Sequence, residues 1–329
     1  MKKAAVSLLI IASLLISLCA CGASVTDFLS YADSAKYTVG GGSVSADEIT
    51  EITVNWVSGS VRIEGSDTDK ITFSEVSSAD KATDAIGEAT KNQELSESLK
   101  MRYRTDGEKL TIQFCKSGLR VRTNAIKDLK KDLTVYLPAG TELKNVKLDV
   151  VSSDVFMSDI KADGLDINSV SAKLKLVSCG TPDFKCNTVS GDLEIKDGGE
   201  IKKLSVKSVS GDVSVQASAL DEISVKTVSG KTSLTAEKPL PGSGIETVSG
   251  NIEVNAPGVE KLNIKSVSAD TVLALDSFDF ILEFKGAAST FEADGILMEK
   301  LGEKKYKFKD GAGSVTFESV SGKVKLEER

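Results

Sequence analysis

Val-Ser-Gly-Asp-Val-Ser-Val-Gln-Ala, residues 209–217, is one copy of a phrase that returns throughout the middle of this chain. A tripeptide Val-Ser-Gly, Val-Ser-Ala or Val-Ser-Ser begins at Val151, Val170, Val189, Val209, Val228, Val248 and Val267. The intervals are 19, 19, 20, 19, 20 and 19 residues. Self-similarity at a fixed period is the signature of a repeat architecture. The chain is therefore expected to be built from one small unit used many times.

Each unit reads as two short strands joined by two corners. Val213 and Val215 alternate with polar neighbours, and Ile223 and Val225 do the same after a polar stretch. Period-two alternation of β-branched residues is typical of half-buried strands. Strands this short cannot bury an apolar face alone, so neighbouring units must stack and share a core. The sequence predicts an all-β protein, a single-stranded β-solenoid similar to a β-helix, with rungs of 19–20 residues.

The third position of the phrase is always small. It is glycine at Gly191, Gly211, Gly230 and Gly250, and serine or alanine in the other copies. Only a very small side chain fits where a corner brings backbone against backbone or where φ is unusual. The serines of the phrase would then form a ladder of hydroxyls that bonds to corner backbone groups. We interpret these positions as corner architecture rather than as a functional serine array.

Atypical sequence on both sides of the regular array predicts capping ends. An early copy of the phrase begins at Val57, preceded by the single tryptophan, Trp56, which we expect to cover the open core rather than to stack on a ligand. A copy at Val76 follows 19 residues later and predicts a second rung. Aromatic residues return after Val267, and Val-Ser-Gly closes the chain from Val320. We assign residues 44–329 to one solenoid domain.

The strand pattern lapses over residues 79–100, where Ala, Glu and Lys are the most frequent residues. We expect an inserted loop or a short helix there. Alternation resumes at Met101, and an Asp106-Gly107 pair before Leu110 predicts a hairpin turn.

The first 20 residues have the form of a lipoprotein signal peptide. Lys2 and Lys3 precede an apolar run that ends in Leu18-Cys19-Ala20-Cys21. A positively charged N-terminal region, a short hydrophobic segment and small residues at the cleavage site define such signals. A permanent membrane span needs about 20 apolar residues. The ending resembles a bacterial lipobox, which implies lipidation of Cys21; an ordinary cleaved secretory signal is the alternative. Residues 21–43 read as a tether, and the expected location is the cell envelope, on the outer face of the cytoplasmic membrane.

The charge balance limits the partners. The whole chain carries 41 basic and 48 acidic residues, and loss of Lys2 and Lys3 changes the net charge from −7 to −9. An acidic chain is a poor match for nucleic acid or for an anionic lipid surface. We expect the membrane to be reached through the lipid anchor. The other partners we consider are an envelope protein, a wall polymer or a second copy of the chain.

Several segments together resemble a bacterial family of adhesin-like proteins that are built from β-strand repeats and have domains of unknown function. They are the stretches 52–61 and 132–138, the repeated Val-Ser-Gly-Asp-Val, the Gly311-Ala312-Gly313-Ser314 turn and the closing Val-Ser-Gly at Val320. The resemblance covers about residues 44–326. It implies an envelope-exposed, non-enzymatic role, often in lipoproteins or beside envelope-stress systems, and it supplies no functional residues to carry over.

The chain contains no histidine, which removes Ser-His-Asp and Cys-His nucleophilic sites and most zinc sites. Asp192 and Asp212 hold equivalent places in adjacent rungs, so they could lie about 5 Å apart, the spacing of a retaining glycosidase. Stacked rungs create such pairs automatically, and Lys173, Lys231 and Asn251 occupy the same place elsewhere. We expect a solvated corner, and a carbohydrate-active enzyme remains the alternative.

Ligand sites of other kinds find little support. No aromatic residue occurs between Lys185 and Ser277, which argues against a sugar-stacking groove. The corners are too varied for a calcium-binding β-roll. We therefore expect no cofactor, no metal and no catalytic residue.

Three cysteines remain beyond the signal and the lipidation site. Cys186 occupies the place of Val225 two rungs later, which predicts a small core residue. Cys179 lies seven residues earlier, and an oxidising compartment would permit a Cys179–Cys186 disulfide, with two free thiols as the alternative. Cys115 follows the alternating Leu110, Ile112 and Phe114, so we expect it to point outward. Taken together, the sequence predicts a lipid-anchored scaffold or interaction surface, with an accessory sensor in an envelope-stress system as a further alternative.

Overall fold

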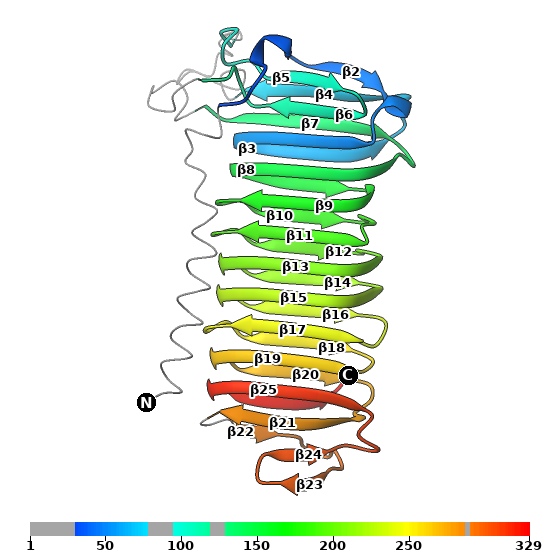
Figure 1. Cartoon of the computed structure of the whole chain (residues 1–329), viewed down its shortest axis with the longest axis vertical. Helices are drawn as coiled ribbons and strands as arrows, with labels where there is room; N and C mark the ends of the chain where they lie inside the picture. Colours follow the sequence, from blue (N-terminus) through cyan, green and yellow to red (C-terminus); the bar gives the residue numbers. More distant parts are fainter. Residues whose placement is uncertain (1–29, 78–94, 119–128, 287–289) are drawn as a thin grey trace, which may run out of the picture. The chain divides into compact units, whose positions relative to one another are not determined.

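The computed structural model describes residues 30–77, 95–118, 129–286 and 290–329. The chain divides into two compact units at residue 179, within the region predicted as one domain. We call residues 30–179 the N-terminal unit and residues 180–329 the C-terminal unit. The regular elements of the described residues are strands (Figure 1), with two short 3-10 turns and no α-helix among them. No helix in the described part is long and apolar enough to cross a membrane. The predicted all-β solenoid is confirmed.

The N-terminal unit contains two 3-10 turns and ten strands. Their bounds are η1 Ser34–Lys36, β1 Thr38–Val39, β2 Gly42–Ser45, η2 Ala46–Glu48, β3 Glu51–Ser66, β4 Lys70–Ser77, β5 Arg102–Asp106, β6 Lys109–Gln113, β7 Lys131–Pro138, β8 Glu142–Ser158, β9 Lys161–Ser169 and β10 Leu174–Val177.

Parallel stacking organises the rungs of the N-terminal unit. β8 runs parallel to β3 over most of its length, from Asn145 opposite Glu51 to Ser158 opposite Glu64. Both strands run through the phrase position, and the two halves of each pair with different strands. β9 then stacks on the first half of β8, and β10 on its second half. Every second side chain of β3 and β8 enters the shared core, as the alternation predicted.

The outer side of β3 is covered differently. β6 and β7 lie parallel to its first and second halves. β5 is antiparallel to β6 and β4 is antiparallel to β7. The prediction of a second parallel rung around Val76 is therefore wrong: residues 70–77 form an antiparallel capping strand. Alternation is the same in both directions, so the sequence pattern does not distinguish them. The hairpin turn at Gly107 is confirmed, with a positive φ of 57°.

Residues 30–43 are folded, which corrects the tether prediction for this part of the chain. β1 pairs with β5 and β2 pairs with β4, both antiparallel. Tyr31 packs on Tyr37 at 4.8 Å between ring centroids, and its hydroxyl donates to the Cys115 carbonyl oxygen at 2.9 Å. Residues 21–29 lie outside the described residues, as do the signal peptide, Cys21 and residues 79–94 of the predicted insertion. Residues 97–100 form a turn that leads into β5.

The C-terminal unit contains sixteen strands in the described residues. Their bounds are β11 Asp183–Thr188, β12 Leu193–Lys196, β13 Glu200–Ser210, β14 Val213–Ala217, β15 Ala219–Ser229, β16 Thr232–Ala236, β17 Gly242–Thr247, β18 Ile252–Ala256, β19 Lys261–Ser268, β20 Thr271–Leu275, β21 Phe280–Gly286, β22 Thr290–Glu292, β23 Glu299–Gly302, β24 Lys305–Lys307, β25 Gly313–Ser321 and β26 Lys323–Glu328.

Two parallel sheets form the body of this unit. β11, β13, β15, β17 and β19 succeed one another on one side, and β12, β14, β16, β18 and β20 on the other (Figure 1). The partner of each residue lies 19 or 20 positions away, as Val206 opposite Val225 and Val225 opposite Ile245 show. Val213, Val215, Ile223 and Val225 are at most 5 % exposed, so the predicted inward faces are confirmed.

The final rung of the chain is not the final rung of the stack. β25 lies between β19 and β21 and is parallel to both (Figure 1). β26 pairs in the same way with β20 and β22. The chain thus reaches the end of the unit with β21 and β22, forms the β23–β24 hairpin, and returns to insert its last rung. β24 is antiparallel to β21 and covers its outer edge.

Aromatic side chains close the core at this end, as predicted. Phe280 and Phe308 lie 5.1 Å apart between ring centroids, and Phe284 stacks on Phe317 at 5.8 Å. Phe280 and Phe308 are fully buried. Aromatic pairs of this kind add stabilisation beyond the area they bury.

Removing one entire rung should leave the array folded. Deletion of residues 209–227 joins Ser208 to Val228 and keeps every column in register, so we expect a β-rich protein that loses only one rung's interfaces, about a few kcal/mol. Deletion of residues 209–218 should unfold the C-terminal unit, because the remaining strand would no longer match the apolar columns. Circular dichroism melts of the two deletions compare them. Equal damage from both would contradict the rung as the structural unit.

Candidate functional site

The corner glycines serve the stacking of rungs. A Cβ atom on Gly211 would overlap the carbonyl oxygen of Gly191 one rung away, and a Cβ on Gly250 would overlap that of Gly230. Gly230 also has φ of +119°, which side chains rarely tolerate. The predicted corner role is confirmed. The serine ladder is confirmed in three copies: Ser229, Ser249 and Ser321 donate to a valine carbonyl oxygen in the neighbouring rung at 3.4–3.5 Å.

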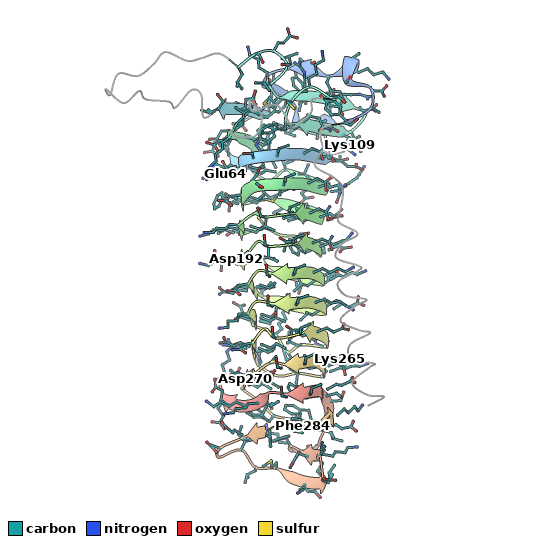
Figure 2. All side chains as sticks on the ribbon, turned by 90° about the vertical axis from the view of Figure 1, so that its left-hand side faces the viewer. Glu64, Lys109, Asp192, Lys265, Asp270 and Phe284 are labelled. Carbon is teal, nitrogen blue, oxygen red and sulfur yellow. The ribbon has the colours of Figure 1, made fainter. Side chains whose placement is uncertain are left out.

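The stacked carboxylates bind backbone amides of the adjacent rung. Asp192 Oδ1 accepts the Asp212 amide hydrogen at 3.0 Å, and Asp212 Oδ1 accepts that of Lys231 at 2.7 Å. Asp270 Oδ1 accepts the Lys323 amide hydrogen at 2.9 Å, and Asn251 fills the same role with an amide oxygen at 3.4 Å. Figure 2 shows Asp192 and Asp270 along one edge of the C-terminal unit. The column acts as a chain of inter-rung hydrogen bonds, with one oxygen of each carboxylate facing a peptide group.

A second column of hydroxyls runs inside the corner, one residue before the phrase. Ser208, Thr227 and Thr247 are buried there. Thr227 donates to the Thr247 hydroxyl at 2.9 Å, and the amides of Gly211 and Gly250 donate to Ser208 and Thr247 at 3.1 and 3.0 Å. Sequence reasoning missed this column, although the Ser or Thr at 188, 208, 227 and 247 was the visible signal. Its function is to hold the corner in place.

A buried lysine lies at the centre of the strands that cover the outer side of β3. Lys131 on β7 is fully buried and pairs with Glu75 on β4 at 2.6 Å. Its ammonium donates to the carbonyl oxygens of Leu99 and Phe114, the first at 2.8 Å. It also lies 5.0 Å from the Trp56 ring and 4.2 Å from the Phe114 ring, within cation–π range. Burial lowers the pKa of Lys131, and the neighbouring Glu75 carboxylate opposes that shift.

Trp56 is a structural residue of this cluster. Its indole Nε1 donates to the Lys131 carbonyl oxygen at 2.8 Å, and its ring meets Phe114 edge-on at 5.0 Å. With no exposed surface, it offers no face to a ligand. The strands β4 to β7 cover the open end of the core next to β3, and Trp56 packs on the core side of these strands.

The cysteines are all buried and free in the described part of the chain. No bridge joins Cys179 and Cys186 in this structure. Cys186 is a core residue in register with Val206, as predicted. The prediction for Cys115 is wrong: only 1 % of this residue is exposed. β6 ends at Gln113 and the chain bends over residues 114–116, so the alternation stops one residue before Cys115.

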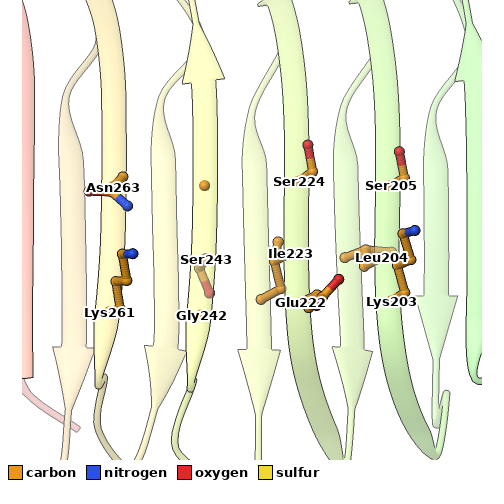
Figure 3. Close-up of a pocket in the computed structure, with 11 residues that line it drawn as sticks. Lys203, Leu204, Ser205, Glu222, Ile223, Ser224, Gly242, Ser243, Lys261 and Asn263 are labelled. Atoms are coloured by element: carbon orange, nitrogen blue, oxygen red, sulfur yellow. The ribbon is translucent and has the colours of Figure 1, made fainter.

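The outward face of β13, β15, β17 and β19 carries a shallow groove of about 540 Å³. Its lining includes Ser205, Glu222, Ser224, Lys261 and Asn263 around the glycines of β17 (Figure 3). Elsewhere on this face, lysines and glutamates pair between rungs, as Lys226 does with Glu246 at 3.1 Å and Lys265 with Glu318 at 3.7 Å. The described residues contain no cluster of metal-ligating side chains.

Comparison with known proteins gives one family and one structural likeness. The family model described as Toastrack DUF4097 matches residues 49–295. A crystal structure titled "putative cell adhesion protein", from Clostridium sporogenes, is similar at 11 % identity over 89 % of this chain and 100 % of that one, with a TM-score of 0.26. No curated protein matches the chain.

Breaking the buried ion pair should destabilise the N-terminal unit strongly. Glu75→Gln would leave the Lys131 ammonium buried without its counter-charge, and we expect a loss of about 3 kcal/mol in the free energy of unfolding. Glu108→Gln is the matched control, because Glu108 pairs with Lys144 at the same 2.6 Å but both side chains are about 60 % exposed. The control should change nothing measurable. Chemical denaturation of both variants gives the comparison, and equal stability would contradict the role of the pair.

Alkaline pH should destabilise the protein through its buried thiols. Burial raises the pKa of Cys179 from 9.0 to about 11, so the folded state holds a proton that the unfolded state releases. This stabilisation is complete below pH 9 and is lost as the pH rises through 11, at a cost of up to about 3 kcal/mol. Cys179→Val should therefore lose less stability than the wild type between pH 8 and pH 11 under reducing conditions. Denaturation midpoints at the two pH values test this, and identical pH slopes would contradict it.

Proposed function

The chain belongs to the Toastrack DUF4097 family, and on that basis together with the geometry above we propose that it is a lipid-anchored scaffold of the cell envelope, non-enzymatic and adhesin-like, whose outer faces bind a partner. The family assignment supports a β-repeat protein of unknown function.

The observation that carries the proposal is the use made of the polar groups that repeat along the rungs. An enzyme of this architecture would need carboxylates that converge on a shared space. Asp192 and Asp212 instead each bind the next backbone amide with one oxygen and lie on an exposed corner. The buried hydroxyls of Ser208 and Thr247 are likewise bonded to corner amides. These repeated groups support the stack, which leaves the flat outer faces as the surfaces for interaction.

The shape of the faces fits a scaffold. Parallel sheets place side chains in straight rows about 4.8 Å apart, which presents an extended, rigid array. Stacked repeats form such surfaces without large moving parts. The predicted lipobox at Cys21 would hold this array close to its membrane, because residues 22–29 reach at most about 30 Å when fully extended.

Changing the lipidation residue tests the anchoring part of the proposal. Cys21→Ala should abolish labelling by a fatty-acid probe and release the protein from the membrane fraction or leave an uncleaved precursor. Cys19→Ala is the matched control, because a small residue at that position keeps the lipobox resemblance, and it should label and fractionate like the wild type. If the Cys21→Ala protein still labels, the anchor proposal is wrong.

A further inference from the structure

β17 differs from its neighbouring strands because two of its three outward positions carry no side chain; the third is Glu246. Its sequence begins Gly242-Ser243-Gly244, and both glycines occupy outward positions. In register with them, β15 carries Glu222 and Ser224, and β19 carries Lys261 and Asn263. Figure 3 shows Gly242 between these two rows. Because Gly242 and Gly244 have no side chains, the backbone of β17 at these positions forms the floor of the groove on this face.

The fold does not require these glycines. A Cβ atom on Gly242 would come no closer than 4.0 Å to the nearest atom, the Asp221 carbonyl oxygen, and one on Gly244 no closer than 3.8 Å to that of Ile223. Neither residue has a positive φ. They thus contrast with Gly211 and Gly250, whose positions leave no space for a side chain. Glycine weakens a strand interior, and it often marks a place where a ligand or another backbone comes close.

The interior of the same rung is also less well filled. Ser243 points inward and is 6 % exposed, whereas Ile223 and Leu262 occupy its column in the adjacent rungs. Its hydroxyl has no hydrogen-bond partner among the described residues. A buried hydroxyl without a partner is unfavourable. The Gly-Ser-Gly sequence is therefore poor for stability on both faces of the strand, which favours a role in recognition.

The rows beside the groove carry charges that the protein leaves unpaired. Lys203, Glu222 and Lys261 form no ion pair within the part of the chain that the structure describes. Other lysines of this face, Lys226 and Lys265, do pair with glutamates of neighbouring rungs. The β15 row beside the groove thus presents the Glu222 carboxylate, with the Lys203 ammonium of β13 in register behind it, and the β19 row presents the Lys261 ammonium.

We propose that this groove binds an extended polypeptide segment of a partner protein, which lies along β17 with acidic side chains toward Lys261 and basic side chains toward Glu222. An extended peptide directs successive side chains to opposite sides, and its repeat of two residues equals the spacing of the outward positions on β15 and β19. The absence of aromatic side chains in the lining disfavours sugar stacking. The backbone of β17 is already paired on both sides, which excludes strand addition to it.

This inference rests on the proposed function, since it names the partner class for one outer face. A binding assay in solution tests it independently of anchoring. The protein used is the mature chain with Cys21→Ala, and the probe is a fluorescent peptide of alternating Glu and Lys. A peptide of the same composition, with its Glu and Lys residues in separate blocks, is the probe control. We expect anisotropy to show binding of the alternating peptide and at least tenfold weaker binding of the block peptide.

The decisive variant fills the groove. Gly242→Thr with Gly244→Thr should weaken binding of the alternating peptide at least tenfold, while the melting temperature stays the same or rises, because threonine suits a strand better than glycine. Ser214→Thr with Ser233→Thr on the opposite sheet is the matched control and should bind like the parent. Lys261→Glu should also weaken binding without unfolding the protein.

Unchanged binding by the filled variant would overturn the proposal, and so would equal binding of the two peptides or a fall in melting temperature that shows the glycines to be needed for folding. Absence of any binding by the parent would overturn it as well. In each case the result of the Cys21 experiment would still stand, so failure of this inference is distinct from failure of the proposed anchor.

Discussion

The close approach of successive corners is the constraint on which the rest of this protein depends. At Gly211 and Gly250 the backbone of one rung meets the backbone of the next without room for a Cβ atom. This contact sets where each strand starts, and with it which side chains of the strand enter the core. The apolar columns through Val206, Val225 and Ile245 follow from that register. A shift of one residue would turn every one of these side chains outward.

Polar groups reinforce the same corner from both sides. Outside it, Asp192 and Asp212 accept amide hydrogens from the next rung, and inside it Ser208 and Thr247 accept those of the corner glycines. Backbone groups at a bend cannot all be satisfied by the sheet ladders, and a buried amide without a partner is costly. The repeating Ser, Gly and Asp of the phrase are therefore a solution to one local problem that is met at every turn. This explains why acidic residues can stack along the edge of the C-terminal unit.

The last strands of each unit are covered by different interactions, and the physical reason is the same in both. A stack of parallel rungs leaves its last strands open to pairing, and open edges invite association with other chains. In the N-terminal unit, β4 and β5 run antiparallel to β7 and β6, and the Lys131–Glu75 pair joins β7 to β4. In the C-terminal unit, the β23–β24 hairpin and a cluster of phenylalanines fulfil the same task. Within the C-terminal unit, β17 keeps two glycines at outward positions of an otherwise regular face.

The sequence by itself determined the rung length, the small residue at each corner and the inward faces of the regular strands. These features repeat, and they depend on contacts between equivalent residues 19 or 20 positions apart, so the period reveals them. The tertiary structure decided the direction of residues 70–77, the insertion of the last rung between β19 and β21, the burial of Lys131 and Cys115, and the groove over β17. Alternating side chains look the same in parallel and antiparallel strands, and a lone lysine or glycine carries no mark of its neighbours. Those features depend on which distant segments meet, and only the folded chain brings them together.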